Sequence, residues 1–167
     1  MKKSKPKKIL VTGGGGFIGK RLIRALEKEG HKVENFDFIN GKDIRNYEQV
    51  EKAIAGKDVV FHLAAAADLN WSREYPIETM DINVTGTTNI AVACAKHNTF
   101  LQYASTCCVY GNQETHPIDE KSHPNPTEIY ACSKLAGEYA VLGYHKLYGL
   151  KHNMLRFATI YGVEMRP

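Results

Sequence analysis

A tyrosine and a lysine four residues apart give this chain of 167 residues the means to move a proton. Tyr130 and Lys134 lie in a stretch of helical character, where residues four apart share one face. A lysine ammonium beside a phenol stabilises the phenolate, so the pKa of Tyr130 is expected to fall from about 10 towards neutral pH. The pair is predicted to act as acid and base, with Thr106 supplying a hydroxyl that positions a substrate oxygen.

A glycine-rich turn strengthens this interpretation, because an isolated tyrosine–lysine pair of this spacing is usually just exposed on an amphipathic helix. The turn follows the apolar run Ile9-Leu10-Val11 and leads into a helix that begins near Phe17. Gly13 permits a tight turn, Gly16 lets a pyrophosphate approach the backbone, and Gly19 allows close packing of helix on strand. The first amides of the helix favour an anion. The turn is therefore predicted to bind the phosphates of a dinucleotide.

The end of the next predicted strand, around Val33 to Phe38, carries a carboxylate at Asp37. Roughly twenty residues beyond a glycine turn, such a carboxylate accepts hydrogen bonds from the adenosine ribose hydroxyls. It would repel the 2′-phosphate of NADP, which calls for an arginine there, whereas Lys42 and Arg45 come later. NAD is therefore the predicted cofactor. The alternative is that Asp37 is an ordinary turn residue.

Composition and charge predict one soluble domain after a short basic tail. The chain is 43% hydrophobic and 24% charged, which is ordinary for a globular protein, and it has no stretch long enough to span a membrane. Its net charge of +4 comes from lysines among the first eight residues, so residues 1–7 are expected to be disordered and residues 8–167 to form the domain. Neither a nucleic acid nor a membrane is an expected partner.

The four cysteines and seven histidines give no metal pattern. No CxxC pair and no zinc-like spacing of Cys and His occurs, and without a signal-peptide pattern a reducing cytoplasm fits best. His62 lies within an apolar strand and is expected to be a hydrogen-bonded core residue rather than a ligand or catalyst. No metal site is predicted.

Apolar strands alternate with helical stretches along the chain, which predicts an α/β fold with a doubly wound parallel sheet of the Rossmann type. Ligands of such sheets bind outside the carboxyl ends of the strands. A long irregular stretch with three prolines, roughly Gly111 to Glu128, is expected to border the active site. After the first strand–helix–strand unit, the predicted elements are the strand Val59 to Leu63, the helix Pro76 to His97, the strand Phe100 to Ser105, the helix Tyr130 to Leu147 and the strand Met154 to Ile160.

A series of motifs occurs in a fixed order between Lys8 and the last residue: Thr12-Gly13-x-x-Gly16-Phe17-Ile18-Gly19, Asp37, Asp43-Ile44, His62-Leu63-Ala64-Ala65, Asn83-Val84-x-Gly86-Thr87-x-Asn89, Ser105-Thr106-x-x-Val109-Tyr110-Gly111, Tyr130-x-x-x-Lys134 with Glu138, and Leu155-Arg156. In this combination the chain resembles the extended short-chain dehydrogenase/reductase family, in particular its NAD-dependent epimerase/dehydratase branch.

The resemblance implies roles for residues that the pattern alone does not assign. Thr106 would share the substrate hydroxyl with Tyr130, and Lys134 would bind the nicotinamide ribose. The other implied cofactor contacts are Phe17 and Ile18 at the pyrophosphate, Asp37 at the ribose, Asp43 and Ile44 near the adenine, Leu63, Ala64 and Ala65 along the cofactor, and Asn83 close to it.

The residues after Thr106 bear on the type of reaction. Sugar dehydratases of this family place an Asp-Glu pair there and decarboxylating members keep the glutamate, whereas this chain has Cys107 and Cys108. A thiol is a poor substitute for a carboxylate in proton transfer, so both reactions are disfavoured. The two cysteines are expected to be mainly small packing residues at the end of the strand, and the alternative is that either of them contacts the substrate.

The leading hypothesis is an NAD-dependent nucleotide-sugar epimerase that works through a transient keto-sugar. The alternatives are an NAD-dependent reductase or dehydrogenase of a small hydroxyl or carbonyl compound, and a non-catalytic NAD-binding module. The last alternative arises because family members normally continue beyond Pro167 into a substrate-binding lobe. The final strand is accordingly expected at an exposed sheet edge. The resemblance also implies a homodimer through the helices that carry Asn83 and Tyr130.

Overall fold

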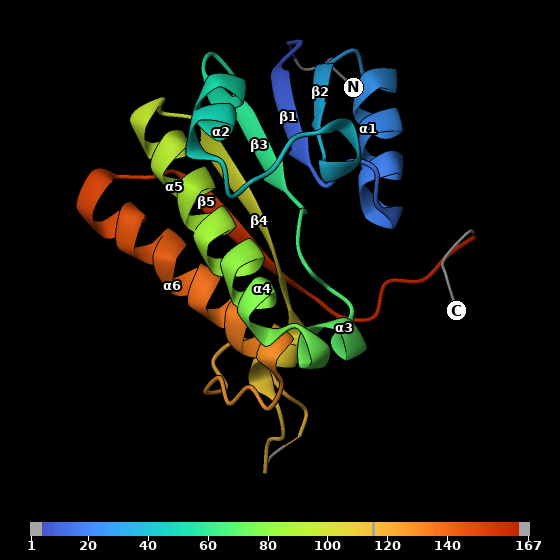
Figure 1. Cartoon of the computed structure of the whole chain (residues 1–167), viewed down its shortest axis with the longest axis vertical. Helices are drawn as coiled ribbons and strands as arrows, with labels where there is room; N and C mark the ends of the chain where they lie inside the picture. The colour runs from blue at the N-terminus through green and yellow to red at the C-terminus, as the bar shows by residue number, and fades with distance from the viewer. Residues whose placement is uncertain (1–4, 115, 164–167) are drawn as a thin grey trace.

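Five parallel strands form one open sheet in the computed structural model, which describes residues 5–114 and 116–163 (Figure 1). The strand order is β2-β1-β3-β4-β5, and every neighbouring pair is parallel. The predicted doubly wound parallel sheet is therefore confirmed. The strands are β1 (Lys8–Thr12), β2 (Lys32–Phe36), β3 (Val59–His62), β4 (Phe100–Thr106) and β5 (His152–Phe157).

Helices cover both faces of this sheet. Figure 1 shows α1 beside β1 and β2, while α2, α5 and α6 form a layer on the other side. The helices are α1 (Phe17–Lys28), α2 (Tyr47–Ile54), α3 (Leu69–Glu74), α4 (Pro76–Met80), α5 (Gly86–Lys96) and α6 (Ile129–Tyr148), with short 3₁₀ turns η1 (Phe38–Asn40) and η3 (Cys107–Tyr110) and a π-helical turn η2 (Asp81–Thr85).

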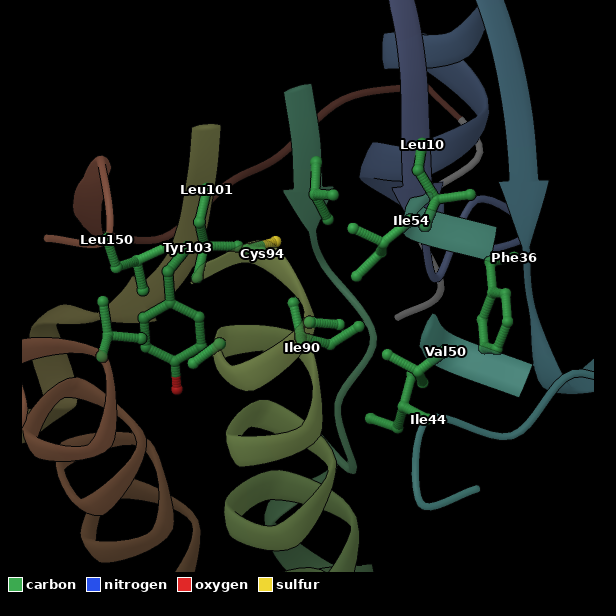
Figure 2. Close-up of a cluster of buried hydrophobic side chains, with 14 residues drawn as sticks. Leu10, Phe36, Ile44, Val50, Ile54, Ile90, Cys94, Leu101, Tyr103 and Leu150 are labelled. Carbon is green, nitrogen blue, oxygen red and sulfur yellow. The ribbon is translucent and has the colours of Figure 1, made fainter. Parts of the chain in front are cut away.

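Successive side chains of each strand point to opposite faces of the sheet, and both faces are buried. Leu10 faces the main core together with Ile90 of α5, while its neighbours Ile9 and Val11 are also buried and point to the opposite face, on which α1 packs. Figure 2 shows this core, in which Leu101 and Tyr103 of β4 project from the strand towards the helices. An apolar run that is buried on both faces is what a parallel sheet requires.

Glycines end the helices where the chain must reverse. Gly30 after α1 has φ +88°, and Gly149 after α6 has φ +68°; other residues rarely adopt this conformation. The predicted continuous helix Pro76 to His97 is instead divided into α4, η2 and α5. The π-helical turn adds a residue to the helix locally, a feature that often marks a functional site, and it carries Asn83.

The last strand lies at the edge of the sheet, as expected, and within the described residues it pairs with β4 alone. It spans His152–Phe157 rather than Met154 to Ile160, because its register is set by pairing Leu101 with His152. The stretch between η3 and α6 has no helix or strand among its described residues, which agrees with the predicted irregular segment. Residues 1–4 of the predicted tail lie outside the described residues.

None of the described helices has both the length and the apolar character that crossing a membrane requires.

Candidate active site

The carboxyl ends of β1, β3 and β4 meet at one edge of the sheet and bring the candidate residues together. From β1 the chain passes to β2 on one side, whereas β3 and β4 lie on the other side, so the switch point of the sheet falls between β1 and β3. Gly13 follows β1, Leu63 and Ala64 follow β3, and Thr106 ends β4. This is the place where open α/β sheets bind their ligands.

The glycine turn is a backbone cradle that side chains would fill. Gly13 has φ +71°, and a Cβ on it would lie 2.7 Å from the backbone nitrogen of Ala64. A Cβ on Gly19 would lie 2.3 Å from the carbonyl oxygen of Gly13. At Gly16, by contrast, only that carbonyl lies within 4 Å. Gly13 and Gly19 are therefore required for packing, while Gly16 keeps the approach to the turn open.

The first turn of α1 has the features of an anion site. Its N-cap is Gly16, and no side chain in the described part of the chain caps its first amides. Phe17 and Ile18, the predicted pyrophosphate contacts, begin this helix and are both partly buried. Uncapped amides at a helix start, beside an open backbone turn, suit a phosphate.

Asp37 directly follows β2 and lies against the glycine turn. One carboxylate oxygen accepts a hydrogen bond from the Gly15 amide at 2.7 Å, and the other accepts one from the Ile39 amide at 3.1 Å. Ile39 reaches over Gly15, since a Cβ there would meet its Cδ1 at 2.5 Å, yet Phe38 and Ile39 are 72% and 73% exposed. Asp37 is thus fixed beside the phosphate turn with an apolar surface next to it.

The predicted adenine contacts Asp43 and Ile44 have separate roles. Ile44 is a core residue, and a Cβ on Gly86 would lie 2.5 Å from its side chain. Asp43 is part of a salt bridge with Arg45, and the hydrogen bonds from that guanidinium lower the pKa of the Asp43 carboxyl. The side chains of both residues stabilise the fold, and their contact with the adenine stays a prediction.

The segment after β3 is held in place by Asn83. Its side-chain oxygen accepts a hydrogen bond from the Ala66 amide at 2.8 Å, and its amide nitrogen donates to the Ala66 carbonyl and to the Ser133 hydroxyl. Ser133 in turn donates to the carbonyl of Tyr130 at 2.7 Å. Asn83 therefore joins the Leu63 to Ala66 segment to α6. Sequence reasoning missed Ser133, although its position between Tyr130 and Lys134 was visible.

Thr106 and Tyr130 form the hydroxyl pair that was predicted. The Thr106 hydroxyl accepts a hydrogen bond from the Cys108 amide and so caps η3, and the Thr106 side chain lies close enough to Tyr130 to favour the phenolate. The expected fall in the pKa of Tyr130 is wrong, however. Burial raises it to about 12, and the neighbouring Cys108 and Cys107 act in the same direction.

Lys134 explains this error because its ammonium lies elsewhere. The side chain is buried, and Nζ is 4.3 Å from the centre of the Tyr103 ring. Burial lowers the pKa of Lys134 to about 7, and the charge of Glu138 opposes that shift. The four-residue spacing placed Tyr130 and Lys134 on one helix face, but it could not show that an aromatic ring of β4 would receive the ammonium.

The expectation that Cys107 and Cys108 are packing residues is also wrong. Both thiols are exposed, and they line a cavity of about 450 Å³ with apolar residues such as Leu69 and Ile118. Two of its lining residues, Cys107 and Ala131, directly follow Thr106 and Tyr130 in the chain, and burial raises the pKa of the Cys107 thiol. None of the four cysteines, all within the described residues, forms a disulfide, and no group of three potential metal ligands occurs there.

A buried ion pair anchors α6 to the sheet. Glu138 accepts two hydrogen bonds from the Arg156 guanidinium of β5, at 2.9 and 2.7 Å, and a third from the Ser105 hydroxyl. Arg156 also donates to the Tyr110 hydroxyl at 2.7 Å, and its pKa is raised mainly by Glu138. The network ties the helix that carries Tyr130 to β4, β5 and η3.

His62 is a core residue, as predicted. Its Nδ1 lies 2.7 Å from the Thr12 hydroxyl and its Nε2 lies 3.0 Å from the Thr87 hydroxyl. Burial, assisted by the charge of Lys134, lowers its pKa to about 3, so the ring is neutral.

A family model described as the NAD dependent epimerase/dehydratase family matches residues 9–167. The chain belongs to the NAD-dependent epimerase/dehydratase family. A putative UDP-glucose 4-epimerase of Methanocaldococcus jannaschii is 35% identical over 95% of this chain and 58% of its own length. A 3-beta-hydroxysteroid dehydrogenase of Mycolicibacterium neoaurum is 33% identical over 93% of this chain and 48% of its own.

Among solved structures, the UDP-glucose 4-epimerase of Thermus thermophilus in complex with NAD superposes with a TM-score of 0.86 and is 32% identical, covering 96% of this chain and 58% of its own length. This epimerase/dehydratase chain therefore spans little more than half of the relatives that it matches. NAD is the family's cofactor, and the backbone cradle at Gly13 to Gly19 and the uncapped start of α1 fit its phosphates.

Replacing Gly19 by alanine tests the phosphate cradle. The added Cβ would meet the Gly13 carbonyl at 2.3 Å, so the turn must shift, and NAD affinity is expected to fall by about 10- to 100-fold. Gly143→Ala is the matched control, because a Cβ there meets nothing within 4 Å. Calorimetric titration with NAD checks both variants. Equal affinity of Gly19→Ala and the unaltered chain would contradict the assignment.

The neutral His62 predicts a loss of stability in acid. Its pKa is about 3 in the fold against an ordinary 6.5, so the unfolded chain gains a proton as the pH falls below 6.5 while the folded chain does not until about 3. The free energy of unfolding should therefore fall across this window by up to about 1.4 kcal/mol per pH unit from this group.

Urea unfolding between pH 7 and 4 measures this dependence. His62→Gln should be less stable at neutral pH but show a shallower pH dependence, whereas the exposed His123→Gln should keep the original slope. Parallel curves for His62→Gln and the unaltered chain would refute the role of His62.

Proposed function

We propose that this chain carries the cofactor and proton-transfer half of an NAD-dependent nucleotide-sugar epimerase. The observation that carries the proposal is the proximity of the Thr106 and Tyr130 side chains at the carboxyl end of β4, beside the glycine cradle at the switch point of the same sheet. A hydroxyl pair next to a nicotinamide cofactor suits the oxidation of a secondary alcohol. Nucleotide-sugars are the substrate class named by the similar 4-epimerases.

The roles of the side chains follow from this arrangement. Thr106 holds the substrate hydroxyl against the phenol, and Tyr130 takes its proton as the carbon becomes a ketone. Bound NAD supplies the reversible hydride acceptor. After the keto-sugar presents its other face, the carbon would take the hydride back from the reduced cofactor on that face while Tyr130 returns the proton to the oxygen. The configuration is then inverted and no net oxidation results.

The raised pKa of Tyr130 places a requirement on the proposed proton transfer. Its pKa is about 12 when burial dominates, so the neutral phenol is the resting form. A phenol is the right donor for the return step, whereas the forward step needs a nearby positive charge to stabilise the phenolate. Because the Lys134 ammonium lies against the Tyr103 ring, the proposed source of that charge is bound NAD, which carries a cationic nicotinamide ring.

A dehydrogenase that releases reduced cofactor is the second candidate, and the similarity to a 3-beta-hydroxysteroid dehydrogenase favours it. It would use the same Thr106, Tyr130 and Lys134. The two functions differ in their products, because an epimerase leaves the nicotinamide absorbance unchanged at completion and a dehydrogenase does not.

Tyr130→Phe tests the proposed chemistry. Removal of the acid–base group is expected to slow conversion by about 10²- to 10⁴-fold while NAD affinity changes little. The assay incubates the NAD-loaded chain with UDP- and dTDP-linked hexoses and separates the epimers by chromatography. Tyr139→Phe, at an exposed position five residues beyond Lys134 on α6, is the control.

Three outcomes would count against the proposal. Net formation of NADH would favour the dehydrogenase, and NAD binding without conversion of any hexose would favour a non-catalytic module. A Tyr130→Phe variant that loses NAD binding would show a structural role for this residue instead.

We also propose that two chains pair through α5, α6 and the turns between them. These helices pack on each other, and α6 exposes Tyr139, Leu147 and Tyr148. Light scattering should give twice the chain mass of 18.7 kDa at micromolar concentration. A mass of one chain would refute the pairing.

A further inference from the structure

We propose that Tyr103 is a positioning residue that holds Lys134 at both ends, through its ring and through its hydroxyl. The Lys134 ammonium lies 4.3 Å from the ring centre, and the Tyr103 hydroxyl donates a hydrogen bond to the Lys134 carbonyl oxygen at 3.2 Å. One side chain of the sheet therefore fixes both the backbone and the charge of this lysine. The inference rests on the proposed function only in taking Lys134 as the residue that serves the cofactor.

The ring has no freedom to move away. Tyr103 lies in the middle of β4 and is completely buried, and Figure 2 shows it projecting into the space between α5 and α6. Gly137 of α6 approaches it so closely that a Cβ would lie 2.4 Å from the hydroxyl. The ring stacks on His62 with centres 5.6 Å apart. Its place is set by three elements before any cofactor arrives.

The glycine at 137 is what allows this approach. An added Cβ would also lie 3.4 Å from a methyl group of Thr87, whose hydroxyl lies 3.0 Å from Nε2 of His62. Any larger residue would push α6 away from β4 and break the contact with Lys134. The absence of a side chain at Gly137 thus leaves the space that the Tyr103 hydroxyl occupies between α6 and β4.

The Tyr103 ring is needed to stabilise the Lys134 ammonium, because the charged groups around Lys134 contribute only part of that stabilisation. Glu138, on the same helix, is the nearby carboxylate, but Arg156 of β5 and Ser105 of β4 already bind its oxygens. His62 of β3 is neutral because its pKa is about 3. Tyr130 is protonated at neutral pH because its pKa is about 12.

The negative face of an aromatic ring favours a cation, and this attraction is strongest where water is excluded. Loss of the ring should therefore lower the protonation midpoint of Lys134 by about 0.5 to 1.5 pH units. The unaltered side chain already titrates near neutral pH, since burial lowers its pKa to about 7. A shift of this size would leave Lys134 largely uncharged at pH 7.

Nuclear magnetic resonance of the chain labelled with ¹³C,¹⁵N-lysine tests the geometry without any substrate. The ε-methylene resonances of Lys134, identified by their absence in Lys134→Arg, should be shifted upfield by the ring current. Tyr103→Phe keeps the ring and should keep the shift and the midpoint. Tyr103→Leu should lose the upfield shift and lower the midpoint.

Tyr144→Leu is the structural control, because Tyr144 packs against the same core from α6. It should reduce stability while leaving the Lys134 resonance unchanged. In the same series, Tyr103→Leu should weaken NAD roughly 2- to 30-fold more at pH 8 than Tyr103→Phe does.

The proposal is overturned if the unaltered chain shows no ring-shifted lysine, a result that needs no variant to fold. It is also overturned if Tyr103→Leu keeps the midpoint, or if its NAD affinity and pH dependence match those of Tyr103→Phe. Failure of the nucleotide-sugar assay would leave these measurements untouched, so the two proposals fail separately.

Discussion

The backbone at Gly13 lies in close contact with the backbone at Ala64 and at Gly19, and the geometry of the site depends on these contacts. A side chain on Gly13 would strike Ala64, and one on Gly19 would strike the Gly13 carbonyl. These approaches let β1, β3 and the start of α1 converge on one point, where uncapped amides face an open turn. The constraint is steric and local. A few glycines in the sequence are therefore enough to predict a cofactor site, and the rest of the sheet supports that site.

A second constraint is the charge buried under α6. Lys134 and Glu138 are almost inaccessible to solvent, and each is satisfied by a neighbour from the sheet, Tyr103 for the ammonium and Arg156 for the carboxylate. A buried ion pair is a weak source of stability, but removal of one partner is costly. The helix that carries Tyr130 therefore has one favoured register against β4 and β5.

The sequence predicted what depends on local pattern and spacing. The parallel sheet and the tight glycine turn followed from alternation and turn chemistry, and the structure agrees, while the joint role of Thr106 and Tyr130 stays a prediction. The sequence did not predict the distances between elements that are far apart in the chain. The ring of Tyr103 takes the Lys134 ammonium, and burial raises the pKa of Tyr130 instead of lowering it. The exposure of Cys107 and Cys108 likewise depends on how η3 turns away from the strand.

The most direct test of the central claim is a calorimetric titration of the chain with NAD and, separately, with NADP. Saturable binding of one NAD per chain, with NADP weaker and the gap reduced in Asp37→Asn, is the result expected from the cradle and the carboxylate beside it. Equal or tighter binding of NADP would contradict the role of Asp37, and the absence of NAD binding would contradict the account of the site as a whole.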